Sequence, residues 1–150
     1  MANSLELGQE VTSSLGYLLK HAHLELDAAT TRALEPFGFD PRSLGVLRVL
    51  ASREPNSQQE IAHLFGVDRT TMVALIDALE SAELVSRHAS EDDRRRNVIE
   101  LTSKGSDIFV QAEAAAKATE ETFLKEVPSY DAMLLRDTLH FIVTGERLKS

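Results

Sequence analysis

Three consecutive arginines, Arg94, Arg95 and Arg96, form the densest positive charge in the chain. They lie in a polar stretch between two segments of β-forming residues, so residues 84–101 predict a β-hairpin with guanidinium groups near its tip. The narrow minor groove of DNA attracts arginine through its negative potential. We therefore expect Arg95 to enter such a groove, and Arg94 and Arg96 to bind phosphates or Asp93.

Two neighbouring residues have supporting roles in this hairpin. Asp93 precedes the arginines, and we expect its carboxylate to orient Arg95 or a neighbour through a charge-assisted hydrogen bond. Arg87, where the hairpin begins, is a weaker candidate for a phosphate contact. A run of charges is also typical of a solvated loop, and the residues alone leave that alternative open.

A second group of candidate DNA contacts lies at the starts of two short helices. Ser57 and Gln58 begin one helix, and Arg69, Thr70 and Thr71 begin the next. Helix N-termini present free N–H groups and a partial positive charge, which suits phosphate. Arg69 can bind a guanine through two hydrogen bonds, and either threonine can bond a base edge or touch a thymine methyl group. The alternative is that all of these are ordinary residues of a solvated first turn.

Capping signals predict the elements that position these residues. Ser57 and Glu60 have the spacing of a capping box, and Gly66 is a good stop for the helix that they begin. Asp68 can cap another helix after a short turn. Two short helices joined by a tight turn that contains glycine predict a helix-turn-helix. A β-hairpin directly after such a unit is a wing.

Longer helices are predicted before this unit. Apolar residues at helical spacing predict one helix over residues 9–34. Asp40 as N-cap, with Pro41 at the first helical position, predicts the start of the next helix. We expect that helix to run until Pro55, which cannot continue it.

Two more helices are predicted after the hairpin. Thr102 is placed to cap a long helix over residues 103–126. Pro128 interrupts that helix, and Ser129 is placed to cap the last one. The order of elements is therefore one long helix, three short ones, a hairpin and two closing helices.

Two stretches of this sequence resemble the MarR family of winged-helix regulators. The first spans the arginine hairpin and its exit, and the second spans the helix-turn-helix. The residues that carry the resemblance are Asp93-x-Arg95, Leu101-Thr102-x-x-Gly105 and the run from Gln59 to Glu80. The order of elements is also similar to the family along nearly the whole chain. Ala74 and Ala78 depart from the family's pattern, which often has polar or basic side chains there, so DNA contacts from those turns are in doubt.

The resemblance implies a mainly α fold with a small β-wing. A winged helix-turn-helix core would occupy about residues 40–102, and dimerisation helices about residues 9–36 and 103–148. It implies a homodimeric transcriptional regulator, most simply a repressor, on a pseudo-palindromic operator in double-stranded DNA. The residues also favour a dimer, because the terminal helices carry more apolar positions than a small central unit can cover.

The resemblance further implies a small-molecule effector, phenolic or aromatic-acid in class, held between the dimerisation helices and the DNA-binding lobe. We expect His21, Leu44, Leu47 and Met72 to line that cavity. The apolar positions among them are more often plain core residues. Such a ligand would act by binding better to a form of the protein that fits DNA poorly.

The net charge of -8 argues against DNA binding unless the cations gather on one face. A helical adaptor that binds only proteins would explain this acidity better, but it would leave the arginine hairpin without a purpose. An enzyme is the other alternative. The sequence has no glycine-rich phosphate loop and no nucleophile elbow, so we expect neither catalysis nor a cofactor.

Other features bound the setting in which the chain works. It has no cysteine, which excludes a disulfide, a thiolate metal site and a thiol redox sensor. His21 and His23 point to different faces of one helix, so we expect no metal site. No apolar run approaches the roughly 20 residues that span a bilayer, and residues 1–10 do not resemble a secretory signal. We therefore expect a cytoplasmic protein without membrane contacts.

Overall fold

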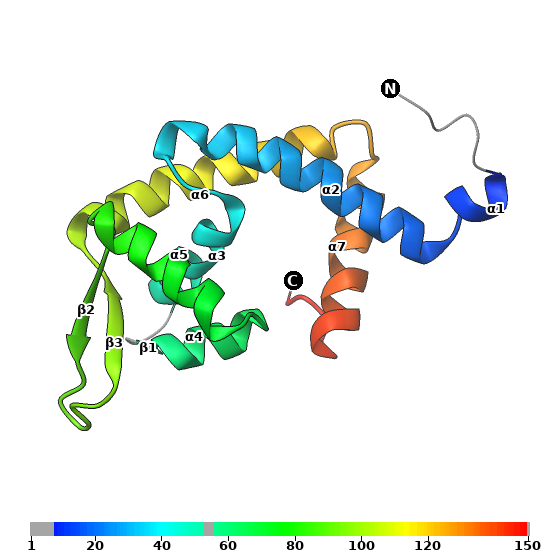
Figure 1. Cartoon of the computed structure of the whole chain (residues 1–150). Helices are drawn as coiled ribbons and strands as arrows, with labels where there is room; N and C mark the ends of the chain where they lie inside the picture. Colours follow the sequence, from blue (N-terminus) through cyan, green and yellow to red (C-terminus); the bar gives the residue numbers. More distant parts are fainter. Residues whose placement is uncertain (1–7, 53–55, 150) are drawn as a thin grey trace.

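Two long helices lie side by side across one end of the molecule, with three shorter helices and a small sheet below them (Figure 1). The long helices are α2 (Leu15–Leu34) and α6 (Ser103–Phe123). This computed structural model describes residues 8–52 and 56–149, so the predictions for the amino-terminal residues and for Pro55 lie partly or wholly outside the described residues. The predicted mainly α fold with a small β-wing is confirmed.

The first predicted helix is broken in two. It consists of α1 (Gln9–Thr12) and α2, separated by Ser13 and Ser14. The Ser14 hydroxyl donates to the Val11 carbonyl at 2.9 Å and accepts from the Tyr17 N–H at 3.4 Å. Serine side chains compete with helical backbone hydrogen bonds in this way. The prediction of one continuous helix over residues 9–34 was therefore wrong at its start.

A compact corner joins α2 to the next helix. A 3-10 turn, η1 (Glu35–Phe37), is followed by Gly38 with φ of 75°, a left-handed conformation that glycine adopts without strain. Helix α3 (Pro41–Ser52) then begins under its predicted cap, since the Ser43 N–H donates to Asp40 Oδ1 at 2.9 Å. The corner brings the end of α2 beside the start of α3.

The helix-turn-helix forms as predicted from α4 (Gln58–Phe65) and α5 (Arg69–Ser81). The capping box is present, with the Glu60 N–H donating to Ser57 Oγ at 3.2 Å and the Ser57 N–H donating to Glu60 Oε2 at 2.8 Å. Gly66 ends α4 with φ of 58°. Asp68 caps α5 by accepting the Thr71 N–H at 2.9 Å.

The wing is a hairpin of β2 (Val85–Ala89) and β3 (Asn97–Leu101), paired antiparallel. A further strand, β1 (Asn56–Ser57), pairs with the other edge of β3, so the order in the sheet is β1-β3-β2. Strand β1 was not predicted, because two residues are too few for a pattern. It ties the start of α4 to the middle of β3.

The closing helices differ from the prediction at their junction. Helix α6 ends at Phe123, and α7 (Ser129–Thr144) begins with Pro128, not Ser129, at the N-cap position. The backbone of Pro128 has φ of -53° and ψ of 140°, as the residue before a helix requires, and no side chain caps α7. The predicted cap by Ser129 was therefore wrong.

Two clusters of buried side chains hold the fold together. The larger one lies between α3, α4, α5 and the sheet. Its members are Val46, Leu47, Leu50, Ile61, Met72, Ile76, Leu79, Leu84, Val85 and Ile99. The smaller cluster joins α2, α3 and α6 through Leu34, Leu44, Ala112 and Ala116. The two small alanines allow α2 and α6 to approach closely. Leu44 in the same cluster holds α3 against these two helices.

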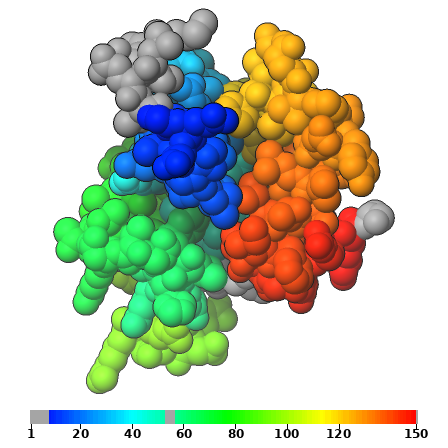
Figure 2. Space-filling model, turned by 90° about the vertical axis from the view of Figure 1, so that its right-hand side faces the viewer, coloured from blue at the N-terminus to red at the C-terminus, as the bar shows by residue number. Residues whose placement is uncertain are grey.

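Helix α7 lies beside the rest of the molecule, and in the single chain none of its residues is buried. Figure 2 shows the face that it forms with α1 and the start of α2. Large apolar side chains are exposed on α2 and α7: Leu15, Leu18, Leu19, Met133, Leu134, Leu135, Ile142 and Val143. None of the described helices has the length and apolarity needed to cross a membrane.

Candidate nucleic-acid interface

The wing tip is held by its own backbone. The Ser90 N–H donates to the Arg96 carbonyl at 2.9 Å, and the Arg96 N–H donates to the Asp93 carbonyl at 3.0 Å. Asp93 Oδ1 accepts the Arg95 backbone N–H at 3.0 Å. Asp93 thus holds the turn at Arg95, the role expected of it, and the donor is the backbone N–H and not a guanidinium group.

The three tip arginines have different surroundings. The side chains of Arg94 and Arg95 are exposed, and across residues 8–52 and 56–149 neither guanidinium has a hydrogen-bond or ion-pair partner. Arg96 turns back toward α4, where its Nη2 lies 3.3 Å from Ser57 Oγ and 3.1 Å from Glu60 Oε1. The structure therefore pairs Arg96 with Glu60 and not with Asp93, and the alternative that Arg96 binds a phosphate stays a prediction.

Arg87 is held by two carboxylates of α5. Its Nη2 lies 2.6 Å from Asp77 Oδ1 and its Nη1 lies 3.1 Å from Glu80 Oε1. The Arg87 backbone N–H also donates to Glu80 Oε2 at 3.1 Å. The arginine side chain is only 21% exposed. This geometry favours a structural role for Arg87, which links the wing to α5, over the phosphate contact expected from the sequence.

The start of α4 offers less to a ligand than its sequence indicates. Ser57 is 7% exposed, and its oxygen already accepts from the Glu60 N–H and from Arg96. The hydrogen bond from the Ser57 backbone N–H lowers the pKa of the Glu60 carboxyl, with help from Arg96, so Glu60 is ionised at neutral pH. Gln58 is the neighbouring side chain that reaches open space.

The start of α5 is better exposed. Arg69 and Thr70 both face solvent, and no ion pair or hydrogen bond holds the Arg69 guanidinium within the described part of the chain. The Thr71 hydroxyl donates to Asp68 Oδ2 at 2.6 Å. This bond lowers the pKa of Asp68, and the Thr71 backbone N–H adds to the effect. Thr71 is therefore committed to the cap, whereas Arg69 and Thr70 are open to a partner.

A polar hollow of about 340 Å³ brings the predicted DNA contacts together. It lies between the starts of α4 and α5 and the tip end of the wing. Its lining residues are Ser57, Gln58, Gln59, Ala62, Arg69, Met72, Arg95, Arg96 and Asn97. Arginines from two separate elements, Arg69 of α5 and Arg95 and Arg96 of the wing, thus line one concave surface, where Arg96 is paired with Glu60. A concave surface with this charge can bind phosphate.

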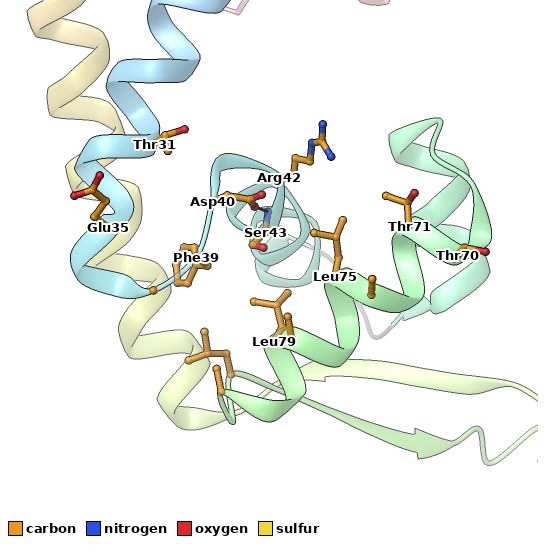
Figure 3. A pocket seen from close by; sticks show the side chains of 15 residues that line it. Thr31, Glu35, Phe39, Asp40, Arg42, Ser43, Thr70, Thr71, Leu75 and Leu79 are labelled. Atoms are coloured by element: carbon orange, nitrogen blue, oxygen red, sulfur yellow. Dashed lines mark hydrogen bonds between the residues drawn. The ribbon is translucent and has the colours of Figure 1, made fainter.

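A larger open hollow of about 790 Å³ lies behind α5. Figure 3 shows Thr31 of α2 and Glu35 of η1 on one side, the first turn of α3 in the middle, and Thr71 and Leu75 of α5 opposite. Its full lining adds Gly38, Phe39, Asp40, Arg42, Ser43, Thr70, Ala74, Ala78, Leu79, Ala82 and Leu84. The hollow therefore lies between α2 and α5.

None of the four side chains predicted to bind a ligand lines this hollow. Leu44 and Leu47 are 1% and 0% exposed and belong to the two buried clusters. Met72 is fully buried and touches the polar hollow from below. His21 stacks on Tyr17 with ring centroids 4.0 Å apart, on an exposed face of α2. These four side chains therefore lie away from the larger hollow, since apolar spacing identified the core, and a ligand contact by any of them stays a prediction.

The sequence did contain one signal for the larger hollow. Ala74, Ala78 and Ala82 recur every four residues and so share one face of α5. Small side chains on a helix face leave space between that helix and its neighbours. Ala74 and Ala78 had been noted as departures from a family pattern, but their consequence for the space beside α5 had not been seen. No pattern in the sequence indicated that Arg42 and Thr31 would also line this hollow.

Comparison with known proteins matches both the wing and the helix-turn-helix. The profile of the MarR family matches residues 40–96. An HTH-type transcriptional repressor of Mycobacterium bovis is 30% identical over 118 residues, which are 79% of this chain and 85% of the relative. The chain belongs to the MarR family. Relatives of this kind are named as transcriptional regulators, and not as enzymes.

Solved MarR-type structures share the arrangement of this chain. A MarR-family regulator from Rhodococcus sp. RHA1 superposes with a TM-score of 0.85 at 28% identity, covering 94% of this chain and 100% of that one. CouR bound to a 23-mer DNA duplex gives a TM-score of 0.81 at 32% identity, covering 93% and 97%. CouR from Rhodococcus jostii RHA1 bound to p-coumaroyl-CoA gives 0.79 at 29% identity, covering 95% and 100%.

Proposed function

We propose that this chain is a transcriptional repressor that acts in the cytoplasm and binds a pseudo-palindromic operator as a homodimer. The observation that carries the proposal is the placement of Arg69 and Arg95. One begins the recognition helix, the other lies at the wing tip, and both line the same hollow. In the winged-helix arrangement such a pair reaches base edges and an adjacent groove of one duplex. The DNA-bound relative CouR supports the same use of the fold.

The homodimer is supported by the apolar face of the terminal helices. Ile142 is 67% exposed and Val143 is 82% exposed on α7, and leucines of α2 are exposed as well. Burying one such side chain is worth about 1.5–3 kcal/mol, so a second copy is a simple way to cover the face. A dimer places two recognition helices about 34–36 Å apart, which is one turn of DNA.

Selection of bound sequences from a randomised duplex library tests the proposed DNA binding. The wild-type protein should recover a pseudo-palindrome whose half-sites are about 10 base pairs apart. Arg95→Ala should weaken binding by a similar factor on that site and on random duplexes, because its contact is mainly electrostatic. Arg32→Ala removes the same charge from an exposed position on α2, where no ion pair holds it among the described residues, and is the matched control. Folded protein that recovers nothing at low salt would contradict the proposal and favour a protein partner.

A small-molecule effector is the second part of the proposal. Thr70, Thr71 and Ala74 form one wall of the larger hollow, so a ligand there would touch the helix that presents Arg69. A ligand that prefers a different position of α5 would shift the protein away from DNA. The hollow mixes apolar walls with Arg42 at its rim (Figure 3). An aromatic acid or its thioester suits this mixture, and CouR bound to p-coumaroyl-CoA supports the choice.

Titration of p-coumarate and p-coumaroyl-CoA into the protein–DNA complex tests the effector. Either compound should release wild-type protein from DNA. Ala78→Leu puts a larger side chain into the hollow and should leave DNA binding intact while preventing release. Ser81→Leu, at the exposed end of the same helix, is the control. Unchanged release from the Ala78→Leu variant would mean that the compound binds elsewhere, and no release from wild type by either compound would reject this ligand class.

A further inference from the structure

The ion pair between Arg96 and Glu60 joins the wing to α4. Arg96 Nη2 lies 3.1 Å from Glu60 Oε1, and the two residues are 36 positions apart in the sequence. The same nitrogen lies 3.3 Å from Ser57 Oγ. Arg96 is therefore engaged inside the protein, unlike Arg94 and Arg95 beside it.

Glu60 has two separate tasks. Its Oε2 accepts the Ser57 backbone N–H at 2.8 Å and completes the capping box, and its Oε1 faces Arg96. The carboxylate is ionised at neutral pH, since the Ser57 hydrogen bonds and Arg96 lower its pKa. The cap needs an acceptor oxygen but no charge, because glutamine also completes a capping box. The negative charge of Glu60 therefore has a role apart from the cap.

We propose that Glu60 is a built-in counter-ion of Arg96 that competes with a DNA phosphate and so weakens binding to every duplex. The inference rests on the proposed DNA binding. Arg96 lines the same polar hollow as Arg69 and Arg95, where a phosphate would bind. A phosphate that takes Arg96 leaves the Glu60 charge without its partner.

The exposure of the pair makes this exchange feasible. Both side chains are 52% exposed. Water screens an ion pair of this kind, so it is weak enough for a phosphate to displace. A protein cation that is already neutralised by a carboxylate also adds little to the release of DNA counter-ions. Wild-type binding should therefore depend on salt as though neither Arg96 nor Glu60 were charged.

Glu60→Gln separates the charge from the cap. We expect the variant to bind a fluorescein-labelled duplex of mixed sequence about threefold more tightly than wild type does. The slope of log affinity against log salt should become steeper by about 0.9, as for one more neutralised phosphate. Glu121→Gln, an exposed carboxylate on α6, makes the same change in net charge away from the hollow and should alter neither quantity.

The Arg96→Gln and double variants identify the cation. Arg96→Gln leaves the capping box untouched and should make the slope shallower by about 0.9. The Glu60→Gln/Arg96→Gln double variant should return to the wild-type slope. A slope that stays steep in the double variant would show that Glu60 acts without Arg96, and would overturn the inference.

The outcomes distinguish this inference from the proposed function. Wild-type protein that does not bind the duplex at low salt overturns DNA binding itself. Wild-type binding with an unchanged or weaker Glu60→Gln variant overturns the competition alone, and a weaker variant would make the pair a strut that positions the wing. Urea unfolding of each variant checks that the capping box has survived.

Discussion

The carbonyl of Leu84 lies so close to Gly105 that a Cβ on the glycine would stand 1.9 Å from its oxygen. Thr102 fixes this approach from both sides. Its backbone N–H donates to the Leu84 carbonyl at 3.1 Å, and its hydroxyl donates to the Glu83 carbonyl at 2.6 Å while accepting the Gly105 N–H at 2.9 Å. The start of the wing and the start of α6 are thereby locked together. The spacing of Leu101-Thr102-x-x-Gly105 follows from this contact.

Replacing Gly105 with alanine should destabilise the fold. The added methyl group would meet backbone, which cannot move aside as a flexible side chain can. We expect the free energy of unfolding in urea to fall by about 1–3 kcal/mol or more, as for overpacking elsewhere. Ser106→Ala, at the next position of α6, adds no atom and should change it by less than about 0.5 kcal/mol. Equal stability of the Gly105→Ala variant and wild type would contradict the contact.

Asp68→Asn should make stability less sensitive to acid. The pKa of Asp68 is lowered in the folded state by the Thr71 hydroxyl and then by the Thr71 N–H. The stability that comes from this carboxylate is therefore complete above its ordinary pKa of about 3.9 and is lost as the pH falls through the lower folded value. Asparagine keeps a cap without a titrating group.

The measurement is the free energy of unfolding at pH values from neutral to strongly acidic. Wild type should lose more stability below pH about 4 than Asp68→Asn does. Glu60 and Asp137 have pKa values lowered in the same direction and remain in both proteins, so the comparison isolates Asp68. Parallel curves would mean that the carboxylate contributes no pH-dependent stability.

Arg87→Ala and Arg94→Ala both remove one arginine from the wing, but the first should lower stability and the second should lower DNA affinity. Arg87 bridges Asp77 and Glu80, so its loss should lower the free energy of unfolding by about 1 kcal/mol and change DNA affinity little. Loss of the exposed Arg94 should spare stability and weaken binding to all duplexes. A larger loss of DNA affinity from Arg87→Ala, measured where both variants are folded, would restore Arg87 as a DNA contact.

Ile142→Glu should break the proposed dimer. The side chain is 67% exposed in one chain, and a charge buried there against a second copy would lack a partner. Light scattering should give a dimer for wild type and a monomer for the variant at micromolar concentration. Ser106→Glu, near the wing on α6, should remain dimeric. A wild-type monomer would refute the dimer, and a dimeric Ile142→Glu variant would move its interface away from the end of α7.

The sequence predicted features whose causes are local. The caps at Ser57, Asp68 and Thr102 depend on residues three positions apart, and all three are present. The wing strands also follow from short runs of β-forming residues. The break at Ser14 is local as well, but the hydrophobic pattern continues through it, and the pattern outweighed the serine side chains in the prediction.

The features that were missed depend on how elements meet. Glu60 and Arg96 are far apart in the chain, and neither residue indicates the other until β1 pairs with β3. Arg87 looked like a surface cation, because the orientation of α5 against the wing was unknown. The larger hollow is likewise a property of three helices together. Leu44 and Leu47 were assigned to a ligand for the same reason, since periodicity identifies an inward face but not what lies opposite it.

Charge at the wing tip is sorted along the turn. Residues 91–96 carry three carboxylates followed by three arginines, so the tip has no net charge, in a chain whose net charge is -8. A duplex at the proposed interface would therefore meet the field of a few placed arginines and not that of a positive body. Such a field acts only within about one Debye length, roughly 8 Å at physiological salt. The attraction would then begin only once protein and duplex are almost in contact.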